Sequence, residues 1–162
     1  MTSRIDLRFS LARAVILISA LALPGTAGAA PIEPGQIRVI DGDTIAVGTV
    51  NYRLVGFDTP ETSTRARCPA ERALGAEATQ RLRIIVAAGG LDLRRVSCAC
   101  RPGTEGTRAC NYGRLCGTLT AGGKDVGDLL IAAGLARLYL FGSSPGPATW
   151  CIRATEAGGD NG

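Results

Sequence analysis

The sequence predicts a small, mainly β domain with helices: an OB-fold, five-stranded Greek-key barrel with two or three packed helices. Three observations support this prediction. Short β-branched stretches alternate with glycine- and proline-rich turns, and one long helical pattern separates the third stretch from the fourth. Removal of an N-terminal leader leaves about 130 residues, which suits one domain with one core.

The first 29 residues have the pattern of an export signal. Three arginines precede an apolar run at residues 14–23, and small residues with an A-x-A cleavage pattern end at Ala29. The alternative is a retained membrane anchor, but a spanning helix needs about 20 apolar residues and this run is far shorter. We therefore expect a signal peptide at residues 1–29 and a secreted or periplasmic monomer with no stable membrane insertion after cleavage.

The predicted strands of the mature chain follow from apolar alternation. Residues 36–47 predict two strands with a bend at Gly42, and residues 52–57 predict a third strand that ends before Pro60. Two further strands are expected at residues 91–96 and 115–120.

Two helices are predicted from composition and spacing. An Ala-, Leu-, Glu- and Arg-rich pattern covers residues 69–88 and ends at a glycine pair, and a second helix is expected at about residues 125–133. These elements place the domain at residues 30–140. Residues 141–162 are rich in Gly, Pro and Ser and are expected to form a tail that is tethered near Cys151.

Six cysteines in an exported chain predict disulfides. The alternative is a zinc site, but the spacings lack the paired C-x2-C units that such sites commonly use. The sequence does not choose among the pairings, although a bond from Cys98 or Cys100 to Cys110 would close the loop between them. The disulfide candidates are Cys68, Cys98, Cys100, Cys110, Cys116 and Cys151.

The composition excludes several classes of enzyme. The sequence has no histidine, which rules out Ser-His and Cys-His nucleophile pairs and zinc sites built on histidine. Its single lysine, Lys124, lacks the glycine spacing of a phosphate-binding P-loop. Without the leader, 15 basic (18 − 3) and 13 acidic (14 − 1) residues remain. Phosphate binding must therefore come from locally placed arginines rather than from a global basic field.

Three clusters carry candidate chemistry. Asp-Gly-Asp-Thr at residues 41–44 places two carboxylates on one side of an extended backbone, although such a pair is more often a plain turn. Residues 53–61 bring an arginine and two carboxylates to the end of a strand; the alternative is a surface ion pair. Residues 111–114, Asn-Tyr-Gly-Arg, present a tyrosine and an arginine at a strand start; the alternative is a hairpin turn with a solvated arginine.

Together, these clusters indicate one site with several carboxylates, two arginines and a tyrosine. Oxygen ligands without histidine or thiolate favour Ca²⁺ or Mg²⁺ over zinc or copper. Two guanidinium groups suit a phosphodiester whose transition state gains negative charge, and a further carboxylate could orient or deprotonate water.

Taken in chain order, these segments resemble the staphylococcal nuclease-like, or thermonuclease, family. The resemblance covers about residues 36–140 and rests on residues 39–44, 53–54 with 58–62, 75–78, 112–114, and Val126 with 134–136. The family has an OB-fold barrel with helices, and it cleaves DNA and RNA phosphodiester bonds with Ca²⁺ to leave 3′-phosphate ends. The resemblance therefore implies an exported, Ca²⁺-dependent nuclease with nucleic acid as its substrate.

The resemblance implies a role for each matched residue. Arg53 and Arg114 would hold the scissile phosphate and stabilise its transition state, and Glu61 would be the general base or would position the attacking water. Tyr112 would line the nucleotide pocket, and Tyr139 is the nearest match to a second pocket tyrosine.

The same resemblance implies a calcium site. Asp43 and Asp58 would bind Ca²⁺ through their carboxylates, Thr59 would bind it through its backbone carbonyl, and Asp41 would lie close by.

The chain departs from the family pattern at three places. Asn111 stands where the prototype has a lysine, Gly127 replaces an asparagine, and the segment between Arg94 and Tyr112 is enlarged and carries three cysteines. Two other functions compete with a nuclease: a non-catalytic nucleic-acid-binding module of the same fold, and a disulfide-stapled envelope protein. Retention of all the catalytic positions favours the nuclease, although fold alone never proves function.

Overall fold

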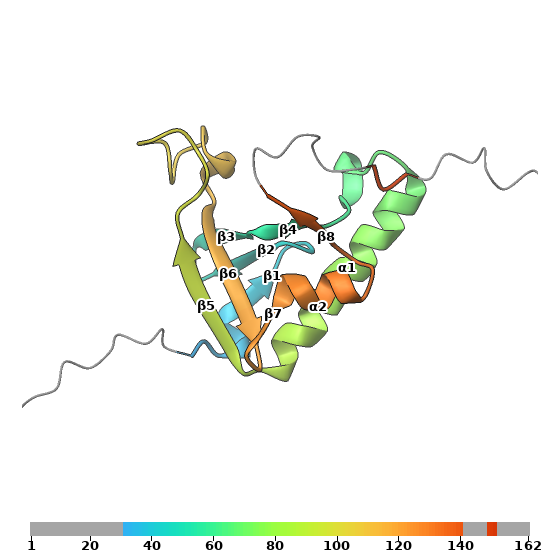
Figure 1. The fold of residues 1–162 in the computed structure, drawn as a ribbon, viewed down its shortest axis with the longest axis horizontal. Helices are drawn as coiled ribbons and strands as arrows, with labels where there is room; N and C mark the ends of the chain where they lie inside the picture. The colour runs from blue at the N-terminus through green and yellow to red at the C-terminus, as the bar shows by residue number, and fades with distance from the viewer. Residues whose placement is uncertain (1–30, 141–148, 152–162) are drawn as a thin grey trace, which may run out of the picture.

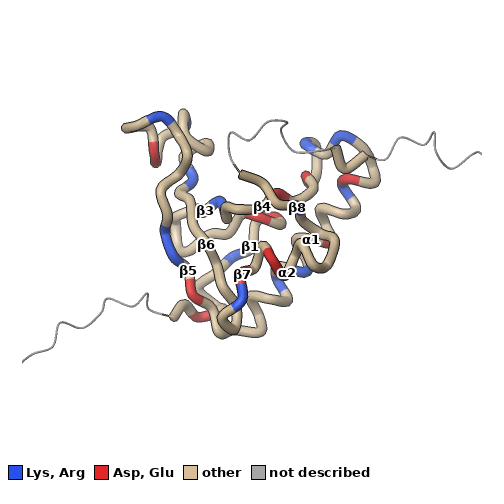
Figure 2. Tube along the Cα trace, viewed as in Figure 1, with Lys and Arg blue, Asp and Glu red and all other residues tan. Residues whose placement is uncertain are grey.

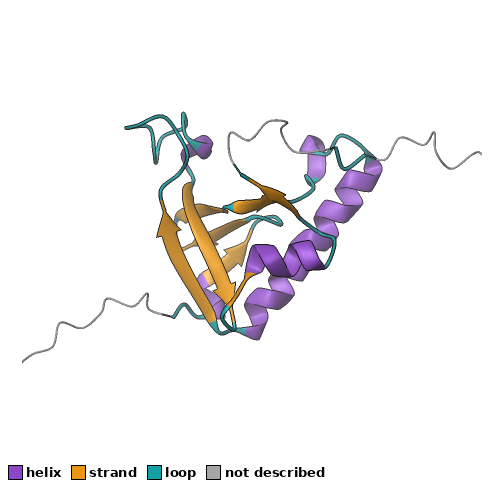
Figure 3. Cartoon of the chain, in the orientation of Figure 1, coloured by secondary structure: helices purple, strands orange, loops and turns teal. Residues whose placement is uncertain are grey.

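A computed structural model of the chain describes residues 31–140 and 149–151 (Figure 1). The expected signal peptide and most of the expected tail lie outside the described residues. A curled sheet faces two helices, α1 (Pro69–Ala88) and α2 (Val126–Ala132), which pack together on one side of it (Figures 1 and 3). The prediction of a mainly β fold with packed helices is therefore confirmed.

The main sheet has the strand order β1-β2-β3-β6-β5, and the two-residue β7 pairs with β6. Neighbouring strands are antiparallel except β3 and β6, which run parallel. A bridge between Ile32 and Leu91 joins the segment before β1 to β5 on the opposite edge, so the sheet curls into the predicted OB-type barrel. The bounds are β1 (Ile37–Val39), β2 (Thr44–Val47), β3 (Val50–Leu54), β5 (Leu91–Val96), β6 (Leu115–Ala121) and β7 (Lys124–Asp125).

The prediction of one continuous strand at residues 52–57 is wrong. β3 ends at Leu54, and β4 (Gly56–Asp58) leaves the main sheet to pair with β8 (Arg137–Tyr139), which the sequence analysis did not identify. The physical reason is Gly56, whose φ of 96° lies in the left-handed region and turns the chain between the two strands. The turn separates Arg53 in the main sheet from Asp58 in the second sheet.

Helix α1 has the predicted bounds because its ends carry clear signals. Pro69 occupies the first turn, Cys68 caps it by accepting a hydrogen bond from the backbone N–H of Glu71, and Gly89, with a φ of 78°, ends it. Its apolar face packs into the core at spacings of three and four residues. The buried residues on that face are Ala78, Leu82, Ile85 and Val86.

Three disulfides join the six cysteines: Cys68–Cys151, Cys98–Cys116 and Cys100–Cys110. The disulfide interpretation is thus supported over zinc, and the favoured loop closure is made by Cys100. Two of the bonds staple the enlarged loop between β5 and β6, residues 97–114, which we call the stapled loop. The third holds the described residues 149–151 against the start of α1. Over the described ranges, no helix combines the length and the apolar character that crossing a membrane requires.

A side chain at Gly127 is expected to destabilise the fold. A Cβ there would collide with the ring of Phe57 in β4 and lie 2.9 Å from an Asp125 carboxylate oxygen that caps α2. Gly127→Ala should therefore lower the free energy of unfolding by about 1–3 kcal/mol in urea titrations. Gly35→Ala, where nothing lies within 4 Å, is the matched control and should change stability little. Equal stabilities for the two variants would contradict this prediction.

Candidate active site

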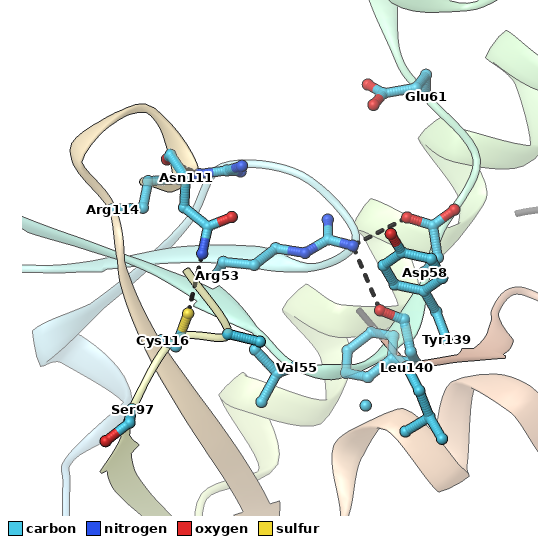
Figure 4. A pocket seen from close by; sticks show the side chains of 13 residues that line it. Arg53, Val55, Asp58, Glu61, Ser97, Asn111, Arg114, Cys116, Tyr139 and Leu140 are labelled. Carbon is cyan, nitrogen blue, oxygen red and sulfur yellow. Dashed lines mark hydrogen bonds and ion pairs between the residues drawn. The ribbon is translucent and has the colours of Figure 1, made fainter. Parts of the chain in front are cut away.

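A cleft of about 560 Å³ lies between the main sheet, β4, β8 and the stapled loop (Figure 4). Figure 4 shows Arg53 reaching across it toward Asp58, Glu61 standing at the rim, and Asn111 and Arg114 on the opposite side. Five residues predicted from the sequence line this cleft: Arg53, Asp58, Glu61, Arg114 and Tyr139.

The guanidinium of Arg53 joins the two predicted metal-binding carboxylates. β2 and β3 pair with Thr44 opposite Arg53, which brings the arginine beside Asp43 at the start of β2. One Nη of Arg53 forms an ion pair with Asp43, and the other lies 2.9 Å from Asp58 Oδ1 and 3.3 Å from the carbonyl oxygen of Phe57. The side chain of Asp43 is only 5% exposed, so this pairing takes place largely away from water.

Two threonines complete the surroundings of Asp43. The backbone N–H and hydroxyl of Thr59 donate to Oδ2 at 3.3 and 3.0 Å, and the hydroxyl of Thr44 donates to Oδ1 at 3.2 Å. Gly42 permits this contact, because a Cβ at residue 42 would lie 2.7 Å from the Thr59 hydroxyl oxygen. The backbone N–H of Asp43 also donates to Asp41 at 3.2 Å. All four residues of the predicted calcium site therefore lie together.

Arg114 reaches the same site from the position just before β6. The parallel pairing of β3 with β6 sets Cys116 opposite Arg53, and Arg114 lies two residues before it. Its Nη1 donates to the Thr44 hydroxyl at 3.0 Å, and its Nε donates to the carbonyl oxygen of Asn111 at 3.0 Å. Two arginines, one in β3 and one just before β6, thus face one cleft.

The two predicted pocket tyrosines are placed differently. Tyr139, in β8, lines the cleft. Tyr112 does not line it: its side chain is 80% exposed, and its ring lies 5.9 Å from the guanidinium carbon of Arg114. Asn111 and Tyr112 both have positive φ values, 48° and 58°, which turn the stapled loop just before Arg114.

Glu61 lies at the open side of the cleft and is 46% exposed. Its carboxylate pairs with Arg65 at 3.1 Å, and Arg65 also lies 3.6 Å from Asp41. Arg65 was not among the residues predicted from the sequence; the available signal was its position four residues after Glu61, a spacing at which opposite charges can meet.

Burial and neighbouring charges shift the ionisation of the site. Burial raises the pKa of Asp43 to about 6; Arg53 opposes this increase, whereas nearby Asp41 and Asp58 add to it. Burial also lowers the pKa of Arg114, and the charge of Arg53 lowers it further. Three carboxylates are therefore held close together, with one guanidinium between two of them.

The donor set fits a hard divalent cation. The carboxylates of Asp41, Asp43 and Asp58 and the carbonyl of Thr59 offer only oxygen ligands, and burial together with the charges of Asp41 and Asp58 raises the pKa of Asp43 despite its ion pair with Arg53. A second group of metal-ligand residue types contains Cys68, Glu71 and Cys151. It does not fit, because a disulfide joins its two sulfur atoms and leaves no thiolate.

Basic and acidic residues are interspersed along the described part of the chain (Figure 2). The positive charge at the cleft therefore comes from its own arginines and not from one basic region of the molecule.

The raised pKa of Asp43 predicts a pH dependence of stability in the metal-free protein. Its pKa is about 6 in the fold against an ordinary 3.8, so the native state holds this proton more tightly than the unfolded state. The contribution of Asp43 to the free energy of unfolding should decrease as pH rises through this window. We expect the difference between wild type and Asp43→Asn, measured by urea unfolding with a chelator, to fall between about pH 4 and 6.5. A constant or growing difference would contradict the assignment.

Comparison with known proteins identifies the family of the chain. The family model described as staphylococcal nuclease homologue matches residues 51–157. The chain is 37% identical over 111 residues to endonuclease YncB and 36% identical over 111 residues to the SPbeta prophage-derived endonuclease YokF, both from Bacillus subtilis (strain 168). Each alignment covers 64% of this chain but only 47% and 33% of the two relatives, so the chain spans less than half the length of either. The family match extends over more than half of the chain, and the protein belongs to the staphylococcal nuclease homologue family.

Proposed function

We propose that this protein is an exported, Ca²⁺-dependent nuclease that hydrolyses DNA or RNA phosphodiester bonds to 3′-phosphate ends. One observation carries the proposal: Arg53, Arg114, Asp58 and Glu61 line a single cleft, with the buried carboxylate of Asp43 paired to Arg53. Family membership and the names of the two relatives, both endonucleases, support the reaction class.

The arginines would bind and stabilise the reacting phosphate. Guanidinium groups form charge-assisted hydrogen bonds with phosphate oxygens, and groups held in place before the reaction lose little free energy to reorganisation. Arg53 is held by Asp58 and by the carbonyl of Phe57, while Arg114 is held by Thr44. Both cations would therefore meet the phosphate from fixed positions as negative charge develops on it.

Glu61 would orient or deprotonate the attacking water. Its carboxylate is half-exposed at the rim of the cleft, so water reaches it, and no histidine exists to serve as the base instead. Asp43, Asp58 and the Thr59 carbonyl, with Asp41 nearby, would hold Ca²⁺, which when bound supplies positive charge near the phosphate.

The alternative is a non-catalytic nucleic-acid-binding module of the same fold. A module of that kind needs basic residues but has no use for Glu61 and the buried Asp43 beside the two arginines. The presence of both acids at the cleft favours catalysis.

Digestion assays test the proposal directly. The oxidised protein should cleave single-stranded and duplex DNA, or RNA, in the presence of Ca²⁺ and should lose this activity on chelation. End labelling should detect 3′-phosphate products. Activity that survives chelation would contradict the metal assignment. A folded protein that binds nucleic acid in Ca²⁺ without cleaving it would establish the alternative function.

Substitution of the proposed catalytic groups should lower turnover without loss of the fold. We expect Glu61→Gln and Arg114→Ala each to reduce kcat by about a hundredfold or more, as is typical for a lost acid–base or electrostatic group. The matched controls are Glu77→Gln on α1 and Arg108→Ala on the stapled loop, both exposed and away from the cleft. Near-normal rates for either catalytic variant would show that its assigned role is wrong.

A further inference from the structure

Glu71 is a buried charged residue that the proposed chemistry does not use. It lies in the first turn of α1, and its side chain is 0% exposed. Its carboxylate accepts the backbone N–H of Arg67 at 2.7 Å and both Nε and Nη2 of the same arginine at 3.2 Å. A buried carboxylate with this many partners holds a fixed position.

The backbone of Glu61 faces the same carboxylate. Burial alone would raise the pKa of Glu71, but hydrogen bonds from the Arg67 side chain and from the backbone N–H groups of Arg67 and Glu61 outweigh it and lower that pKa. The Glu71 carboxylate therefore binds the loop at residues 61–67 through Arg67 at one end, and it faces the backbone of Glu61 at the other end. The first of these residues carries the carboxylate at the rim of the cleft.

A second contact holds the same backbone against α1. A Cβ on Gly75, one turn after Glu71, would lie 2.7 Å from the carbonyl oxygens of both Pro60 and Glu61, so this backbone rests directly on the helix. The Nε of Arg72 also donates to the carbonyl oxygen of Ser63 at 3.1 Å. The first two turns of α1 thus hold the loop at several points.

The Cys68–Cys151 disulfide lies beside the carboxylate of Glu71. Cys68 caps α1, and the sulfur of Cys151 is 3.8 Å from Oε2 of Glu71. Burial of a carboxylate is costly unless hydrogen bonds and charges compensate it, and here only Glu71 is buried, because the Arg67 side chain is 53% exposed. A positioning role gives a reason for a charged residue at this buried place.

We propose that Glu71 is a positioning residue for Glu61: its carboxylate holds the loop at residues 60–67 against α1 and so fixes where the Glu61 side chain stands at the cleft. The catalytic part of this inference rests on the proposed function; the structural part does not. The two parts are therefore tested with different measurements.

The kinetic test is a double-mutant cycle on the oxidised full chain. Glu71→Gln keeps the size of the side chain but removes its charge, and it should lower kcat by about tenfold or more, since small displacements of a reacting group are costly. KM should change by less than about threefold, because Arg53 and Arg114 come from other elements. In a Glu61→Gln background, Glu71→Gln should lower kcat by less than about twofold. Equal effects in both backgrounds would overturn the proposal.

Two further variants separate positioning from general destabilisation. Glu77→Gln makes the same chemical change on the exposed side of α1 and should leave kcat and KM unchanged. Gly75→Ala should lower kcat even though alanine is the better helix former, because the added methyl displaces the Glu61 backbone. If Gly75→Ala retained wild-type kcat, contact between this backbone and α1 would not govern turnover, and the proposal would be overturned.

A measurement without activity makes the structural part independent of the proposed function. Amide hydrogen exchange, followed by NMR, should show faster exchange at Glu61 and Arg67 in Glu71→Gln, with core amides of β6 unchanged. If wild type cleaves nothing but the exchange changes, the proposed function fails and the structural role of Glu71 stands. Unchanged exchange at both amides would overturn that role even if wild type is an active nuclease.

Discussion

The buried carboxylate of Asp43 is the constraint on which the rest of the site depends. A carboxylate removed from water costs several kcal/mol unless charges and hydrogen bonds compensate it. Asp43 obtains Arg53 from β3 and Thr59 from the loop after β4, so one buried group ties three segments together. Gly42 leaves the space in which Thr59 approaches. The need to compensate the charge of the Asp43 carboxylate therefore brings these segments together at the centre of the site.

Arg53 has two functions that depend on the same contacts. Its ion pairs with Asp43 and Asp58 neutralise carboxylates that would otherwise repel each other, and they also aim its guanidinium into the cleft. A bound cation would use the same carboxylates, so it would share with Arg53 the compensation of their charge. Binding of a metal ion and positioning of the arginine would therefore be coupled through Asp43 and Asp58.

Features encoded locally could be predicted from the sequence, whereas features made by tertiary contact could not. The ends of α1 carry a proline, a capping residue and a glycine as local signals. The candidate catalytic and metal-binding residues could be predicted because their order and spacing along the chain form a recognisable pattern. β8 has only three residues, so its pairing with β4 left no pattern to detect. Glu71 looks like an ordinary exposed glutamate in a helical first turn; only the loop folded over it and the distant Cys151 bury it.

The three proposed catalytic groups are fixed by three different means, although the chain has no histidine to build a site from. Arg53 is fixed by the buried Asp43 and the partly exposed Asp58, and Glu61 by the contact of its loop with α1. Arg114 follows three residues with positive φ, and two of them, Asn111 and Tyr112, are not glycine; non-glycine residues adopt this conformation only where the surroundings enforce it. The flanking cysteines, Cys110 and Cys116, are both in disulfides and hold that turn. Stabilisation of a phosphoryl transition state depends on fixed charges more than on acid–base strength, so in the proposed nuclease a rigid scaffold would compensate for the missing imidazole.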